Sequence, residues 1–171
     1  MKMAIEMGIG CIVAIVMTVG PGAAQTGTKA SKAEQHFIMD AVQGDISEVS
    51  MGKLAQQNGQ SDGIKQFGKM LEQDHSEHLQ KTQQMASQLG INPPTAASPK
   101  AKATYNRLSK LSGAAFDKQF AQDMIKDHKE DIAEYQKEAG KRSSPLAEFA
   151  RQTIPTLQTH LKAAQSLTPG R

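Results

Sequence analysis

Residues 90–99 read GINPPTAASP and divide the chain into two helical halves. Gly90 is a favourable helix end, and Pro93-Pro94 stops further winding because proline lacks a backbone donor and restricts the residue before it. Ser98-Pro99 then supplies a helix cap followed by a suitable first-turn residue. This segment therefore predicts a long irregular connection between two helical regions.

Two long helices are predicted before this connection. The first spans about residues 32–57 and is preceded by Ser31, which has the capping-box spacing to Glu34. The second spans about residues 62–89, and the turn between the two contains Asn58-Gly59. Because this turn is short, the two helices are expected to pack as an antiparallel hairpin.

Three helices are predicted after the connection: a short one over about residues 99–112 and long ones over about 115–139 and 145–167. Two helical hairpins joined by one long crossover are the connectivity of ferritin-like bundles. We therefore predict an all-α, ferritin-like four-helix bundle over residues 31–168, with a short extra helix in the crossover.

The composition agrees with one helical domain and narrows the function. The chain has 171 residues, of which 38% are hydrophobic and 4% aromatic, which is enough for a single core. The net charge is +3, and acidic residues alternate with basic ones along each predicted helix, so no basic stripe forms. Nucleic acid is therefore not an expected partner.

The N-terminal 24 residues have the pattern of an export signal. Lys2 supplies positive charge, residues 7–19 are almost entirely apolar, and Gly22-Ala23-Ala24 are small enough for cleavage. Residues 25–30 are then a flexible segment before the bundle. We expect a soluble periplasmic protein without a transmembrane segment, and extracellular or outer-membrane association remains open. The single cysteine, Cys11, lies in the signal, which excludes thiolate chemistry from the mature chain.

Each long helix places polar side chains among its apolar positions. Phe67 precedes Asp74-His75 by the same spacing that separates Phe120 from Asp127-His128, which makes an internal repeat. On helical projections we place Asp74 and Asp127 near the centres of the apolar stripes, with the two adjacent histidines on the flanks. The candidate metal ligands are Glu48, Asp74, His75, His78, Asp127, His128 and His160.

Two interpretations of these residues remain open. Imidazole and carboxylate ligands suit zinc, manganese, iron or copper, and buried ionisable groups must find partners, so a divalent metal site is one interpretation. The other is a metal-free network of buried polar pairs that fixes helix register. The sequence has no nucleophile elbow, glycine-rich phosphate loop or His-Glu-x-x-His motif, so no catalytic activity is predicted.

Several segments resemble a known family of bacterial exported proteins. The most specific are the paired motifs Met70-x3-Asp74-His75 and Met124-x2-Asp127-His128. The others are Phe37, Gly44-Asp45-Ile46-Ser47-Glu48-Val49, Phe116-Asp117 and Leu157-Gln158-Thr159-His160-Leu161. The family is an uncharacterised ferritin-like bundle family, often labelled predicted outer-membrane protein or domain of unknown function. The resemblance covers residues 33–164 and implies a helical bundle in the cell envelope, without an activity to carry over.

Together, these observations lead to two expected functions. The first is an exported bundle of the cell envelope that binds a divalent transition metal and is associated with envelope stress tolerance. The second is a metal-free structural or protein-interaction bundle in the periplasm, whose charged faces contact another envelope protein.

The cleavage site gives the first testable prediction. Protein recovered after secretion should begin at Gln25, because Gly22 and Ala24 are the small residues that signal peptidase requires. Intact-mass spectrometry of the secreted protein measures this directly, and a chain that retains Met1 would contradict it.

Overall fold

The computed structural model describes residues 30–142 and 144–168, so the expected signal sequence and Cys11 lie outside the described residues. The helices, in chain order, are α1 (Lys32–Asn58), α2 (Asp62–Gln88), α3 (Pro99–Leu108), α4 (Gly113–Ala139) and α5 (Ala147–Ser166). The predicted all-α fold class is confirmed, and every helix predicted from the sequence is present.

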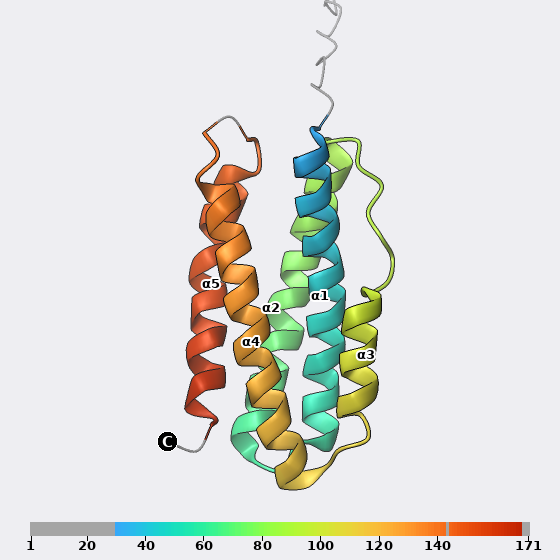
Figure 1. Ribbon diagram of the computed structural model, residues 1–171, viewed down its shortest axis with the longest axis vertical. Helices are drawn as coiled ribbons and strands as arrows, with labels where there is room; N and C mark the ends of the chain where they lie inside the picture. The colour runs from blue at the N-terminus through green and yellow to red at the C-terminus, as the bar shows by residue number, and fades with distance from the viewer. Residues whose placement is uncertain (1–29, 143, 169–171) are drawn as a thin grey trace, which may run out of the picture.

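The four long helices form a bundle of two hairpins (Figure 1). α1 packs mainly on α2, and α4 packs mainly on α5, while fewer contacts join the two hairpins. The chain crosses from one hairpin to the other between Gln88 and Gly113, and α3 lies along the outer side of α1 on this path. None of the helices in the described ranges has the length and hydropathy that a membrane span needs.

Local capping interactions explain most of the helix ends. Ser31 Oγ accepts a hydrogen bond from the Glu34 backbone nitrogen at 3.2 Å, and Glu34 Oε2 accepts one from the Ser31 nitrogen at 2.7 Å, which completes the predicted capping box. Ser61 and Ser98 cap α2 and α3 through their hydroxyl oxygens alone, which accept hydrogen bonds from the backbone nitrogens of Ile64 and Ala101. After α2, Gly90 adopts a φ of 65°, a conformation that glycine tolerates without a steric penalty.

Three helix boundaries differ from their predictions. α3 ends at Leu108 and not at about residue 112, and α4 begins at Gly113 and not at about residue 115. α5 begins at Ala147 and not at Pro145. The hydroxyl of Ser144 accepts a hydrogen bond from the Leu146 nitrogen at 3.1 Å and donates one to the buried carboxylate of Glu138. These bonds hold the residues before Ala147 in a turn that joins the end of α4 to the start of α5.

The apolar core is divided into two clusters along the bundle. One cluster gathers around Phe67, Leu71, Phe116 and Phe120, near the α1–α2 turn. The other gathers around Phe37 and Tyr135, whose rings meet edge to face with centroids 4.9 Å apart. Between the two clusters, all four long helices contribute buried polar side chains: Asp45, Glu48, His75, Thr82, His128, Thr153 and His160.

α1 and α2 approach each other closely at Gly52 and Gly68. A Cβ atom added at Gly52 would lie 2.5 Å from the Gly68 carbonyl oxygen, and one added at Gly68 would lie 2.6 Å from the Gly52 carbonyl oxygen. Both obstacles are backbone atoms, so a side chain at either position would force the helices apart.

Gly52→Ala should therefore destabilise the protein by about 1–3 kcal/mol, because the overpacking exceeds the helix propensity that alanine adds. Gly44→Ala is the matched control on the same helix, since a Cβ there meets nothing within 4 Å. We expect this control to stabilise the protein by about 0.5–1 kcal/mol. Urea unfolding measures both, and equal effects of the two substitutions would contradict the close approach.

Candidate metal centre

Three histidines meet in the polar layer between the two core clusters. His75 comes from α2, His128 from α4 and His160 from α5, and all three residues are buried, with 5% or less of their surface exposed. One ring nitrogen from each histidine lies within 4.8 Å of the corresponding nitrogen of the other two. The layer thus brings three imidazoles from three helices to a common point.

A hydrogen-bond acceptor holds the outer nitrogen of each ring. His75 Nδ1 lies 3.0 Å from Asp45 Oδ1, and His160 Nε2 lies 2.8 Å from Asp74 Oδ2. His128 Nδ1 lies 3.0 Å from the carbonyl oxygen of Met124. Because a carboxylate or carbonyl oxygen can only accept, these outer nitrogens carry the protons, and the inner nitrogens of the neutral rings carry lone pairs.

The inner nitrogens of the three rings face one another, and none of them carries a proton that could be donated in a hydrogen bond. His128 Nε2 and His160 Nδ1 are 3.2 Å apart, so two lone pairs face each other when both rings are neutral. His75 Nε2 is buried and has no hydrogen-bond partner among the described residues. Two nitrogens on a tetrahedral metal ion are about 3.3 Å apart at ordinary zinc–nitrogen distances. A cation at this point would satisfy all three lone pairs.

The surroundings favour neutral imidazoles. Burial, followed by the charges of His75 and His160, lowers the pKa of His128 from 6.5 to about 3. Burial also lowers the pKa of His160, against the opposing effect of its hydrogen bond to Asp74. Both rings are therefore unprotonated at neutral pH, which is the form that binds metal.

Asp45 anchors the layer from α1. It is 3% exposed and accepts from His75, from His78 Nδ1 at 2.8 Å and from Thr82 Oγ1 at 3.3 Å. Burial raises the pKa of Asp45, but the hydrogen bonds from His75 and His78 outweigh it, so the pKa is lowered. His78 Nε2 continues the network to Thr153 Oγ1 on α5, 3.1 Å away.

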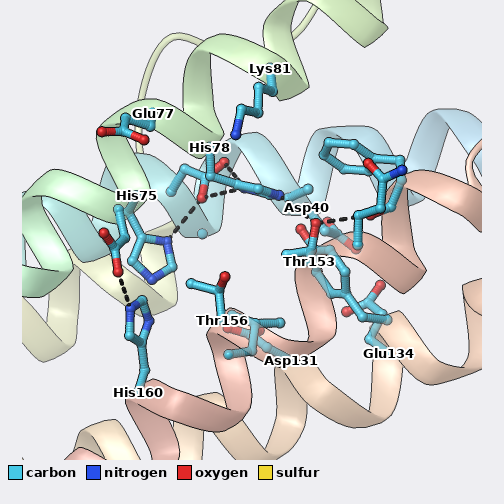
Figure 2. A pocket seen from close by; sticks show the side chains of 18 of the residues that line it. Asp40, His75, Glu77, His78, Lys81, Asp131, Glu134, Thr153, Thr156 and His160 are labelled. Atoms are coloured by element: carbon cyan, nitrogen blue, oxygen red, sulfur yellow. Dashed lines mark hydrogen bonds and ion pairs between the residues drawn. The ribbon is translucent and has the colours of Figure 1, made fainter.

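A cavity of about 270 Å³ opens beside the histidines (Figure 2). Figure 2 shows His75 and His160 pointing toward each other across it, with Thr156 and Asp131 on its wall. Acidic side chains dominate its remaining polar lining: Asp40, Asp45, Asp74, Glu77 and Glu134. The centre therefore has a negatively charged approach that suits a cation.

The structure separates the predicted ligands into three groups. His75, His128 and His160 form the cluster. Asp74 and His78 lie next to the cluster without belonging to it. Asp74 forms a hydrogen bond with His160, and His78 forms one with Asp45. Glu48 and Asp127 are not part of the cluster, and both line a second cavity.

The aspartate and the histidine of each repeated Asp-His pair have exchanged the positions predicted for them on the buried face of the helix. His75 and His128 are buried, whereas Asp74 and Asp127 are partly exposed. The projection was centred on the large apolar residues, but small or weakly apolar residues on one flank are also buried, including Gly68, Thr82, Ala86 and Ala121. When these small residues are included in the projection, the centre of the buried face moves by about 50° around the helix axis, toward the histidines.

Asp45 is the important residue that the sequence interpretation missed. On a projection at about 100° per residue it falls between Ala41 and Ile38, inside the apolar arc of α1. The same argument that singled out Glu48 applies to Asp45, so the signal was present.

The fold and the site define an all-α bundle with a buried three-histidine cluster of metal-ligand geometry. The sequence model of a protein family described as "Domain of unknown function (DUF4142)" matches residues 19–167. The chain therefore belongs to this family. This confirms the predicted membership of a family of unknown function, while export and the outer-membrane label stay predictions. No curated protein matches the chain.

A solved structure shares the fold. The crystal structure of a DUF305 fragment from Deinococcus radiodurans matches with a TM-score of 0.71 and 18% sequence identity. The match covers 82% of this chain and 97% of that fragment. At this identity the likeness shows the fold alone.

The lowered pKa of His128 predicts how stability depends on pH in chelator-treated protein. Between about pH 6.5 and 3, the unfolded chain binds a proton at this residue and the folded chain does not, so the stability falls as the pH falls. His128→Leu should reduce this slope, measured by urea unfolding at several pH values. His36→Leu is the control, because it removes an exposed imidazole from α1. Equal slopes for wild type and His128→Leu would contradict the assignment.

Proposed function

We propose that this protein binds one divalent transition-metal ion through His75 Nε2, His128 Nε2 and His160 Nδ1. The observation that carries the proposal is the direction of the three rings: each outer nitrogen is held by an acceptor, and the three inner nitrogens converge without a proton donor. Acceptors of this kind orient metal-binding histidines and fix their tautomers in known sites.

The ligand set favours zinc or copper among the four metals considered. Three neutral imidazoles suit zinc, copper and iron, whereas manganese prefers oxygen ligands. Three protein ligands leave one coordination position for water or another small ligand, as in zinc sites with an open position. The cavity beside His75 and His160 provides space for it. Since the described residues offer no nucleophile or cofactor motif, we propose binding and no reaction.

The proposed setting is the cell envelope. The expected export signal and the absence of cysteine after residue 24 suit an oxidising compartment, where a histidine site avoids thiol oxidation. A buried metal site in that compartment is consistent with a role in envelope stress tolerance, through sequestering a reactive or scarce metal. The setting rests on the sequence, and the metal site rests on the geometry.

A metal-free structural bundle is the second candidate, with another envelope protein as its partner. The hydrogen bonds of Asp45 favour it, because His75, His78 and Thr82 satisfy this carboxylate without any ion. The two candidates differ in what added metal does to stability.

Purified untagged protein should bind one zinc or copper ion per chain, and His128→Ala should abolish tight binding. Asp74→Asn keeps the three ligands but weakens the acceptor of His160, so it should lower affinity about 10- to 100-fold. At a free metal concentration about 100 times Kd, the wild type gains about 2.7 kcal/mol of stability. Isothermal titration and metal-dependent melting temperatures measure these effects.

His36→Ala is the control for this experiment, because it removes an exposed histidine of α1 and should leave both affinity and metal-dependent melting unchanged. If His128→Ala and wild type gain the same melting temperature from metal, the three-histidine site is wrong. The structural candidate would then account for the layer, with each substitution costing about 1–3 kcal/mol through a partner left unsatisfied.

A further inference from the structure

A second cavity, of about 470 Å³, lies between α1, α3 and α4. It shares Asp40, Gly44, Asp131 and Glu134 with the cavity beside the histidines, but no histidine lines it. Its carboxylate-bearing residues are Asp40, Glu48, Asp123, Asp127, Glu130, Asp131 and Glu134. An acidic lining does not by itself indicate a ligand. The burial of each carboxylate and its hydrogen-bond or ion-pair partners therefore decide whether this cavity can bind one.

Glu48 is the decisive residue of this cavity. Its side chain is 1% exposed, and neither of its carboxylate oxygens has a hydrogen-bond partner among the described residues. A buried carboxylate without hydrogen bonds or a counter-ion is strongly unfavourable in a protein interior. Glu48 lies on α1 between the two core clusters, and it lines this cavity.

The basic residues that line the cavity do not pair with Glu48. Lys100 lies 3.1 Å from Glu130, and Arg107 lies 2.7 Å from Asp123, so the two cations of α3 that line this cavity are paired with acids. Lys126 lies 3.9 Å from Glu130. No ion pair within the described residues involves Glu48, Asp127 or Asp131, which leaves three carboxyl groups without a countercharge in contact.

The pKa values of Glu48 and Asp131 are both raised in this cavity. Burial, followed by the charge of Asp127, raises the pKa of Glu48 well above its usual value. Burial, followed again by Asp127, raises the pKa of Asp131. Glu48, Asp127 and Asp131 all line the same cavity.

We propose that this cavity binds a hard divalent cation through Glu48, Asp127 and Asp131, at a site separate from the three-histidine centre. The ligands are all carboxylate oxygens, which suit magnesium, calcium or manganese(II) better than zinc or copper. Among the described residues, the three histidines are the only group of three or more His, Asp or Glu side chains whose ligand atoms all lie within 4.8 Å of one another, so the three carboxylates are more widely spaced. The cation therefore keeps several waters, which fill the wider space between the carboxylates, as such ions commonly do.

This site goes beyond the proposed function and does not depend on it. The side chain of α3 residue Lys100 sits at the rim with its ammonium held by Glu130, so the crossover helix covers the cavity without supplying the missing charge. A cation would neutralise the buried Glu48, which the protein otherwise has to keep protonated or unpaired.

Manganese(II) is the probe for the test. Untagged protein is first loaded with one equivalent of zinc to occupy the histidine centre, and the loss of the free manganese electron paramagnetic resonance signal then measures binding. The wild type should bind one manganese ion per chain, and Glu48→Gln should weaken this binding at least about ten-fold, because affinity depends on ligand charge. Glu148→Gln, at an exposed glutamate of α5 that pairs with Arg151, is the control and should bind as wild type does.

Asp131→Asn provides a second variant with the same expected loss, and circular dichroism confirms that each variant is folded. The proposal is overturned if the wild type does not bind manganese, or if both folded variants bind it as tightly as wild type. It is also overturned if Glu48→Gln removes the visible spectrum of cobalt(II) bound in place of zinc, since Glu48 would then be a ligand of the histidine centre.

Discussion

The structure depends on a polar layer enclosed between two apolar clusters. Asp45, His75, His128 and His160 are almost completely buried at mid-height of the bundle, where each unpaired polar atom is costly. The layer is satisfied at its outer atoms, by Asp45, Asp74 and the Met124 carbonyl, and unsatisfied at its centre. A protein that needed only helix register could use apolar residues here, and the proposal of a metal-binding function rests on this unsatisfied centre.

The layer also connects the two hairpins. The contact of Asp45 with His75 lies within the first hairpin, and the contact of His128 with His160 lies within the second. Asp74 to His160 and His78 to Thr153 are the hydrogen bonds that cross between α2 and α5. Fewer contacts join the two hairpins than join the helices within each hairpin. These polar contacts therefore contribute strongly to the relative orientation of the hairpins.

The fold was largely predictable because its signals are local. Capping residues such as Ser31 and Ser98, the glycine at 90 and the proline pair in the crossover act within a few positions, and helix pairing followed from turn length. The site was only partly predictable, because it depends on how far each helix is rotated about its axis. Large apolar residues suggested one rotation for α2, but the buried small residues Gly68 and Ala86 reveal another. His75 therefore lies inside, and Asp74 lies at the edge. The rotation of a helix about its own axis is determined by packing against the neighbouring helices. The sequence of one helix alone therefore predicts it poorly.

The arrangement of the hairpins also bears on the order of folding. Helices that are neighbours in sequence pair with each other, so most contacts are local and each hairpin can form early, whereas docking of one hairpin on the other closes a longer loop. His75 meets His128 and His160 only after docking, so the histidine cluster does not exist in an isolated hairpin. An ion bound there would stabilise the docked state more than the transition state that precedes it. Its main kinetic effect would be slower unfolding, with little change in the rate at which the helices form.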